Sequence, residues 1–340
     1  MLQQRGHQVT LIDAADPEAG SGAALGLLMA QVFHRPSGRA WRLRQRSLEL
    51  WSQWIPQLQA AGHPVSLRRG LLLLASSPEE LVRQQALCAA RQAMGLPLRL
   101  CSADDLKALQ PQLPATALGG LWSAADGQID PQPLLQALRH EAQALGTTVV
   151  QDRVLTLEAG NASRWRLKLA SGPWLQSNTV VLCAGSGSAA LLSDLGIGTT
   201  QQPALEPVLG QALELQAGPG HGAWSWQGDW PAAVVWQGIN LVPQPQGHLW
   251  LGATLEPGRS ASPAALAQMA GLNGHAPPWL QGASVVRQWQ GLRPRPQGRP
   301  APWLEQLTPG LLLASGHYRN GLLLAPATAE WLAAQLFMPL

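Results

Sequence analysis

The chain has 340 residues, of which 46% are hydrophobic and 13% charged, and its formal net charge is +3. These values indicate a globular protein of one or two domains rather than a disordered chain, and so small a charge does not require a nucleic-acid partner. The three cysteines are scattered, no apolar run reaches the roughly 18 residues of a membrane span, and the first residues lack a signal-peptide pattern. We therefore expect a cytoplasmic protein without structural disulfides or membrane contact.

The first residues are typical of the second half of a nucleotide-binding βαβ unit. Residues 2–6 predict the last turn of a helix capped by Gly6, and residues 8–13 predict a short buried strand that ends on Asp13. The strand and glycine-rich loop of the first half are not in the sequence. We expect them about 20–25 residues upstream of Leu2, and we expect the nucleotide sheet to lack its central strand.

A small-residue segment and a long helix follow. Residues 19–26 carry almost no side chains and can therefore pass close to a ligand. A helix capped by Ser37 is expected next, because hydrophobic residues recur at helical spacing. These residues are Trp41, Leu48, Trp51, Ile55 and Leu58. Four arginines share one face near its start and read either as an anion-binding ridge or as a solvated surface. The members of this arginine ridge are Arg35, Arg39, Arg42 and Arg46.

Strands and helices alternate through the rest of the first half. Clear helix starts occur at Ser77, which precedes proline and two acids, and at Ser102, which precedes Asp105 in a capping box. A strand ending at Cys183 leads into a small-residue turn over 184–187, a place where open α/β sheets bind ligands. The expected strands are 69–75, 149–155, 164–169 and 179–183, and the expected helices are 78–95, a short one after Ser102 and 131–146.

From about residue 207 the pattern changes to short strands separated by turns, with a hairpin around "QPQG". The stretch 216–230 reads as an exposed loop. The last block returns to strand, turn and helix. We therefore expect an α/β fold, with a dinucleotide-binding, Rossmann-like domain and an inserted, mainly antiparallel β-sheet domain. The expected strands are 208–215, 232–236, 240–243, 248–253 and 310–314, and the last helix begins at about Leu322.

The sequence lacks the residue patterns of several common catalytic and metal-binding sites. No histidine is spaced along the chain to share a metal with another histidine or cysteine, and "CAGSG" has alanine at position 184 where a hydrolase carries its nucleophilic serine. The sequence also lacks a phosphate-binding P-loop and a clear pair of carboxylates. We therefore expect no metal site and no catalytic acid, base or nucleophile.

The remaining chemistry-bearing stretch is "GHYRNGLLLAPATAEWLA", residues 316–333. A strand ends, a polar glycine-rich turn follows, and a helix starts after Gly321 with its N-terminal amides directed back at the turn. Such a helix start suits an electron-rich edge, such as the O2 side of a flavin ring. A packed C-terminal helix with an irregular entry is the alternative.

This turn resembles the C-terminal flavin motif of the D-amino acid oxidase superfamily, most closely that of the glycine oxidases of thiamine biosynthesis. Other stretches resemble the same family in the same order: "DGQIDPQPLLQAL", "VVLCAGSGS", "PVLGQALEL", "GHLWLGATLEPG" and "WQGLRP". The resemblance implies FAD as the cofactor. It also implies an FAD-binding domain over 1–65, 130–206 and 290–340, and a substrate-binding domain over 66–129 and 207–289.

The resemblance further implies roles for individual residues. Arg293 matches the arginine that pairs with the substrate carboxylate, Arg319 lies beside that pocket, and Asn240 stands where glycine oxidases carry a substrate-holding tyrosine. Asp13 would bind the adenosine ribose. The other implied cofactor contacts are Ala24, Gly26, Leu27, Val154, Ala184, Gly185, His317, Tyr318, Arg319, Asn320, Gly321, Leu322 and Leu323.

The implied activity is oxidation of glycine or a related small amino acid or amine. Hydride leaves Cα for the flavin, the imine gives an oxo acid and ammonia, and oxygen becomes hydrogen peroxide. Three alternatives stay open: a flavin dehydrogenase or oxidase of sarcosine, D-amino acids or another amine; a cofactor-free truncated homologue; and a tRNA-modifying member, supported only by the arginine ridge. The sequence allows a homo-oligomer, and nucleic-acid binding is not expected.

Overall fold

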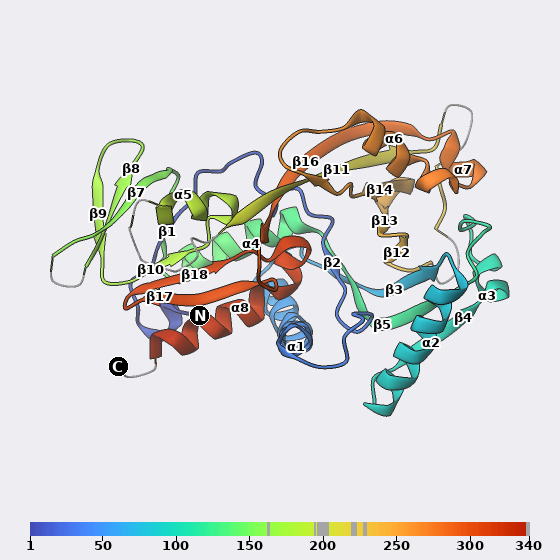
Figure 1. Cartoon of the computed structure of the whole chain (residues 1–340), viewed down its shortest axis with the longest axis horizontal. Helices are drawn as coiled ribbons and strands as arrows, with labels where there is room; N and C mark the ends of the chain where they lie inside the picture. The colour runs from blue at the N-terminus through green and yellow to red at the C-terminus, as the bar shows by residue number, and fades with distance from the viewer. Residues whose placement is uncertain (162–163, 194, 196–203, 219–222, 227–229, 338–340) are drawn as a thin grey trace.

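The computed structural model describes residues 1–340 except 162–163, 194, 196–203, 219–222, 227–229 and 338–340. The fold is mixed α/β, as the sequence predicts (Figure 1). The helices are α1 Arg39–Ala60, α2 Pro78–Ala93, α3 Ala103–Lys107, α4 Pro131–Ala144, α5 Ser188–Ser193, α6 Pro263–Ala270, α7 Pro278–Gln281 and α8 Gly321–Phe337. In the described residues, none of them is long and apolar enough to cross a membrane.

The largest sheet in the described part of the structure has ten strands, which come from both halves of the chain. Its strands lie in the order β15-β11-β14-β13-β12-β3-β5-β2, with β16 paired to β11 and β4 paired to β5. All neighbours are antiparallel except β12 and β3. The strand bounds are β2 Leu27–Leu28, β3 Leu67–Ala75, β4 Leu98–Ser102, β5 Gly119–Ile129, β11 Leu205–Gln216, β12 Ala233–Trp236, β13 Ile239–Gln244, β14 His248–Gly252, β15 Glu256–Pro257 and β16 Ser284–Pro296. The predicted hairpin around "QPQG" is β13–β14.

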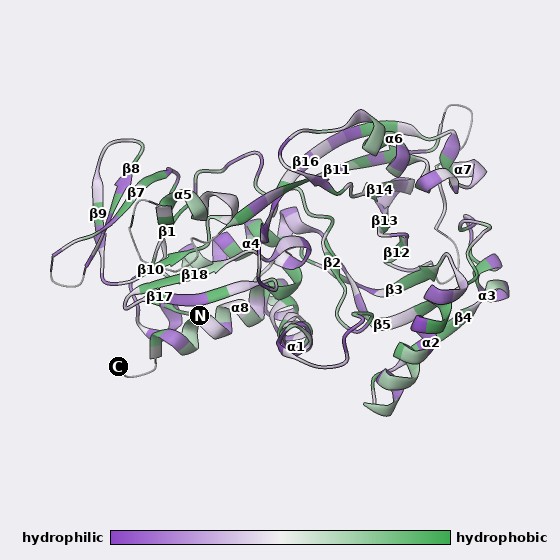
Figure 2. Ribbon diagram, in the orientation of Figure 1, coloured by the Kyte–Doolittle hydropathy of each residue, from purple (hydrophilic) through white to green (hydrophobic). Residues whose placement is uncertain are grey.

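The other parallel pairs lie in two separate small sheets. Strand β1 (Thr10–Ile12) pairs with β6 (Thr148–Val150), whereas β18 (Leu311–Ser315) lies between β10 (Val180–Leu182) and the antiparallel β17 (Trp303–Thr308). Figure 2 colours β10 and β18 as hydrophobic, and every residue of β18 is buried.

The predicted burial of the first strand is wrong. The side chain of Leu11 is 41% exposed, because β1 has a partner strand on one side only. The expected strand 149–155 is two strands, β6 and β7 (Val154–Ala159), and β7 continues into a meander with β8 (Trp165–Leu169) and β9 (Trp174–Ser177).

Local helix signals behave as expected with one exception. The hydroxyls of Ser77 and Ser102 accept the backbone N–H of Glu80 and Asp105, and Gly6 ends its short helix at φ 87°. The cap of α1 is Gly38 rather than Ser37, and no side chain caps that helix. All five hydrophobic residues of the predicted α1 stripe are buried, and all of them except Trp41 share a cluster with residues of α4 and α8.

Four tryptophans form one cluster where an exposed loop was expected. Trp224, Trp226 and Trp230 are half-buried with Trp279 beside them, and neighbouring rings lie 5.0–6.2 Å apart between centroids. The indole N–H groups of Trp230 and Trp279 donate to the carbonyls of Pro111 and Gln112. The prediction therefore fails for these tryptophans, and residues 219–222 and 227–229 of the stretch lie outside the described part of the chain.

Candidate active site

The small-residue segment 19–26 lies across β16 and reaches the end of β5. The amide of Leu292 donates to the carbonyl of Glu18 at 2.9 Å, and the indole of Trp289 donates to the carbonyl of Ala23 at 3.1 Å. Gly26 has φ +82°, and a Cβ atom there would lie 1.7 Å from the carbonyl oxygen of Ile129. A side chain at position 26 is therefore excluded by backbone conformation and by space.

A buried acid and a buried base hold the segment that follows β2. The Asp126 carboxylate accepts the backbone N–H groups of Ala30, Gln31 and Val32 at 2.8, 2.9 and 3.0 Å. Arg91 is 0% exposed and donates to carbonyls of the same segment, at Gln31, Phe33 and Arg35. The two side chains thus satisfy the donors and the acceptors of a loop that lacks ladder partners.

The turn between β18 and α8 meets the end of β10. The hydroxyl of Ser315 donates to the carbonyl of Gly185 at 3.1 Å, and β10 and β18 run parallel, so both strand ends lie at one edge. A Cβ atom on Gly316 would lie 2.5 Å from Cγ of Pro296. Tyr318 has φ +54°, an uncommon conformation for a residue with a side chain. This backbone brings the first turn of α8, which contains no acid, next to the β10 end.

Arg293 on β16 lies over the backbone of β11. A Cβ atom on Gly210 would sit 2.0 Å from Nη2 of Arg293, so glycine is what lets the guanidinium lie flat on the sheet. Its Nη1 donates to the carbonyls of Thr254 and Leu209 at 3.0 and 3.4 Å, and among the described residues no carboxylate forms an ion pair with it. Burial lowers the pKa of Arg293 to about 10, and the nearby cation Arg319 adds to this effect. A desolvated guanidinium without a carboxylate partner is stabilised by an anionic ligand.

Asn240 lies on the same face of the sheet. It pairs with Gly252, Gly252 pairs with Ala212, and Ala212 stands two residues from Gly210 on β11. Directly paired and alternate residues point to one side of a sheet, so Asn240 faces the same side as Arg293. Asn240 is 8% exposed, and its Oδ1 has no hydrogen-bond partner among the described residues.

Asp13 and Val154 lie near each other at the other predicted end of the cofactor site. Asp13 follows β1 directly, its amide donates to Val150, and its carbonyl accepts the amide of Asp152, two residues before Val154. The carboxylate of Asp13 is half-exposed and lies 3.8 Å from the guanidinium of Arg139. An exposed acid at the carboxyl end of a parallel strand is the arrangement that the ribose contact requires.

The structure therefore brings most of the predicted site residues into two groups. One holds the small-residue segment with Ala24 and Gly26, the Ala184–Gly185 turn, residues 316–323 and Arg293; the other holds Asp13 and Val154. Leu323 is 1% exposed and packs in the core, and its carbonyl accepts the indole N–H of Trp51 at 3.2 Å. Arg319 is exposed and its Nη2 donates to the carbonyl of Gly238 at 3.4 Å. Asp126 was missed, because a lone acid in "AADG" carries no signal that it binds a segment almost 100 residues away.

His317 gives the site a dependence on pH. Its Nε2 lies 2.9 Å from Oγ1 of Thr328, and burial lowers the pKa of His317 from 6.5 to about 4, with a smaller contribution from Arg39. The unfolded chain takes up this proton as the pH falls through 6.5, whereas the folded protein does not until about pH 4. The unfolding free energy should therefore fall between these values, by about 2–3 kcal/mol, and level off below them.

This prediction is checked by denaturant unfolding from pH 4 to 7.5, comparing the wild type with His317→Gln. The variant lacks the titrating group, so its profile should be flatter over that window. Parallel profiles would show that His317 titrates alike in both states.

This arrangement of parallel strand ends, glycine turns and a helix start is typical of proteins that bind a dinucleotide cofactor. The sequence model of the DAO family, described as FAD dependent oxidoreductase, matches residues 1–335. The chain belongs to this family and is an FAD-dependent oxidoreductase.

Known proteins similar to this chain include a glycine oxidase and a bifunctional protein of tRNA biosynthesis. Glycine oxidase of Geobacillus kaustophilus is 26% identical over 341 residues, which cover 96% of this chain and 86% of that protein. Its crystal structure matches with a TM-score of 0.84 over 98% of this chain and 88% of the other. The tRNA 5-methylaminomethyl-2-thiouridine biosynthesis bifunctional protein MnmC of Burkholderia mallei is 31% identical over 262 residues, which cover 75% of this chain and 37% of that protein.

The residues at the first group fit a flavin. Gly185 has φ +55°, and the buried hydroxyls of Ser186 and Ser188 that follow it have no hydrogen-bond partner among the described residues. Such orphaned donors next to an acid-free helix start are suited to the oxygen atoms of a cofactor. Asp13 supplies an acceptor for a ribose hydroxyl. The cofactor-free alternative therefore has no support from these side chains.

Proposed function

We propose that the chain is an oxidase of glycine or a related small amino acid or amine. The observation that carries this proposal is Arg293, a partly buried guanidinium without a carboxylate partner among the described residues, next to the turn that fits a flavin. A bidentate contact to the substrate carboxylate would pair this charge and fix the substrate. The similarity to glycine oxidase supports the same substrate class.

In this mechanism the protein binds and orients, and the cofactor supplies the chemistry. The residues after β10 and the β18–α8 turn would hold FAD, which when bound would supply the two-electron oxidation of the substrate at Cα and the reduction of oxygen to hydrogen peroxide. Arg293 would hold the substrate carboxylate, and the backbone of the β18–α8 turn would hold the cofactor near this arginine. Glu256 is engaged by Gln211 and Thr254, and His317 stays neutral at pH 7. We therefore assign no catalytic acid or base, and propose that the amine binds neutral.

The experiment that tests this function is peroxide release by the purified flavoprotein over a panel of glycine, sarcosine, iminodiacetate, D-amino acids and matched amines that lack a carboxylate. The proposal expects the highest kcat/KM among small amines that carry a carboxylate. A panel in which amines without a carboxylate react equally well would contradict the role of Arg293. Turnover with a dye but not with oxygen would make the protein a dehydrogenase.

We expect Asn240 to lower the stability of the fold while it contributes to activity. The substitution Asn240→Leu keeps the branched shape and the number of side-chain heavy atoms and removes the buried unpaired Oδ1, so it should raise the unfolding free energy by about 1 kcal/mol. If Oδ1 accepts a substrate N–H group, the same change should lower kcat/KM about tenfold. Thermal unfolding and steady-state kinetics of the variant check both effects. A variant that loses stability instead would show that Asn240 has a structural role.

A second candidate function is action on an amine carried by tRNA. Two observations favour it: the 31% identity to MnmC and the arginine ridge. Arg35, Arg39 and Arg42 are exposed, and the described residues provide no carboxylate partner for them, whereas Arg46 is paired with Glu49 and Glu330. Binding of bulk tRNA that weakens steeply with salt and with Arg42→Glu would support this function. Equal binding by the variant would exclude the ridge as its site.

A further inference from the structure

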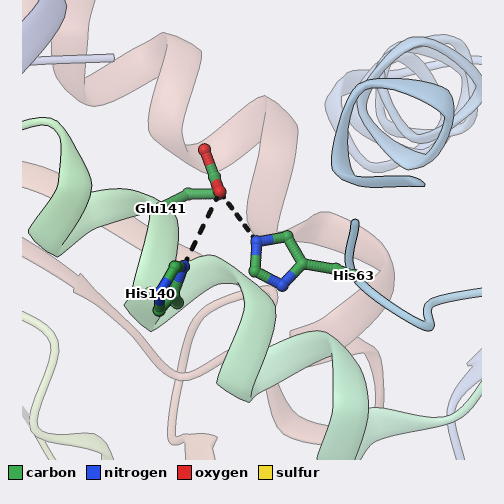
Figure 3. A group of neighbouring side chains, drawn as sticks. All are labelled: His63, His140 and Glu141. Atoms are coloured by element: carbon green, nitrogen blue, oxygen red, sulfur yellow. Dashed lines mark hydrogen bonds and ion pairs between the residues drawn. The ribbon is translucent and has the colours of Figure 1, made fainter. Parts of the chain in front are cut away.

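Three metal-ligating side chains meet outside the candidate active site. His63 follows α1, and His140 and Glu141 are consecutive on α4 (Figure 3). Their ligand atoms all lie within 4.8 Å of one another. Nε2 of His63 lies 2.7 Å from Oε1 of Glu141, and Nδ1 of His140 lies 3.9 Å from the same oxygen. The sequence analysis did not predict this group, because 77 positions separate the two histidines along the chain.

The backbone that carries these side chains is held in place. The amide of His63 donates to the carbonyl of Leu58 at 3.0 Å, after Gly62 turns the chain at φ +88°. Leu58 and Val65, on either side of His63, share a buried cluster with Ala137, one helical turn before Glu141. Core packing therefore fixes His63 and Glu141 relative to each other, and a cation would find two of its ligands already positioned.

The exposed fractions suit a site that keeps an open position. The side chains of His63, Glu141 and His140 are 14%, 35% and 72% exposed, so the third ligand can move to adjust its distance. Two imidazoles and one carboxylate, with water as the fourth ligand, form a set that zinc takes in proteins. Imidazole disfavours magnesium and calcium, which prefer oxygen ligands.

A similar histidine–glutamate pair elsewhere in the chain shows what distinguishes this group. Nδ1 of His248 lies 2.9 Å from Glu214, but the third group there is the guanidinium of Arg287, 3.1 Å from the same carboxylate. The positive charge of Arg287 therefore lies where a metal ion would have to bind. Around Glu141, the third group is an imidazole, which offers a lone pair when neutral.

We propose that His63, His140 and Glu141 form a binding site for a divalent cation of the zinc class. The cation would tie the end of α1 to α4. Gln132 near the start of α4 donates to the carbonyl of Gly22 at 2.8 Å, so the proposed site lies toward the other end of the helix that supports the small-residue segment. The site therefore has a supporting role and takes no part in the reaction.

The test uses the chelator-treated full chain, titrated with zinc chloride by calorimetry and followed by thermal unfolding. Zinc at 100 times its Kd should raise Tm by about 5 °C. His140→Ala changes an exposed residue and should fold normally, yet it should weaken zinc binding by at least about tenfold, as should Glu141→Gln. The matched control is His248→Gln, which removes the other histidine–glutamate pair and should leave zinc affinity unchanged.

A cobalt derivative separates this site from the cysteines, because its spectrum should lack thiolate charge-transfer bands. The proposal is overturned if zinc leaves Tm unchanged. It is also overturned if His140→Ala binds zinc as tightly as the wild type, or if magnesium binds with equal affinity.

Discussion

Replacing Arg293 with alanine is expected to raise the KM for a carboxylate substrate by about 30-fold or more while flavin stays bound. The substrate carboxylate would lose a buried charged partner, which costs about 2–5 kcal/mol. Nearby Arg319 cannot take its place, because it is exposed and its hydrogen bond goes to Gly238. Steady-state kinetics together with the visible absorption of bound flavin measure the two parts of this prediction.

Two further variants make this test specific. Gly210→Ala introduces a methyl group 2.0 Å from the Arg293 guanidinium, so it should raise KM without changing any charge. Arg287→Ala removes an exposed arginine of the same strand, bonded to Glu214, and should leave KM unchanged. Equal KM values for Arg293→Ala and Arg287→Ala would remove Arg293 from the substrate site.

Replacing Asp126 with alanine is expected to give the largest loss of stability, at least about 3 kcal/mol. Three buried backbone N–H groups would lose their acceptor at once, and each unsatisfied group costs about 1–3 kcal/mol. Arg91 would also lose the nearest charge that favours its cationic form. Denaturant unfolding measures the loss, and flavin binding should weaken with it because the segment after β2 is released.

Asp126→Asn should fall between the alanine variant and the wild type. Its remaining Oδ1 can still accept the amides of Ala30 and Gln31, but its NH₂ group faces the amide of Val32. Asp130→Ala is the matched control, since this exposed acid accepts one amide as the cap of α4 and should cost only about 1 kcal/mol. A loss at Asp126 no larger than at Asp130 would contradict the account.

The parts of the fold that sequence predicts well are those whose cause is local. The caps at Ser77 and Ser102 depend on residues three positions apart, and the stripe of α1 depends on a period of 3.6 residues. The candidate role of Arg293 is implied by family resemblance, not by local pattern. The use of these residues in binding stays a prediction.

The parts that sequence did not predict depend on contacts between distant segments. Strand β17 lies along β18, whose pairing uses backbone groups that any sequence carries. The segment after β2 is held by Asp126 and Arg91, which come from β5 and α2. His63 and His140 meet only because α1 and α4 pack together. None of these contacts leaves a periodic trace in the sequence.

The tryptophan cluster has a consequence for observing this protein. Aromatic rings whose centroids lie 5.0–6.2 Å apart couple their electronic transitions, so Trp224, Trp226, Trp230 and Trp279 act together as one chromophore. The coupling weakens steeply as the rings separate. Near-ultraviolet circular dichroism can therefore follow the opening of this corner of the molecule separately from the flavin-binding half, whose visible absorption lies in another part of the spectrum.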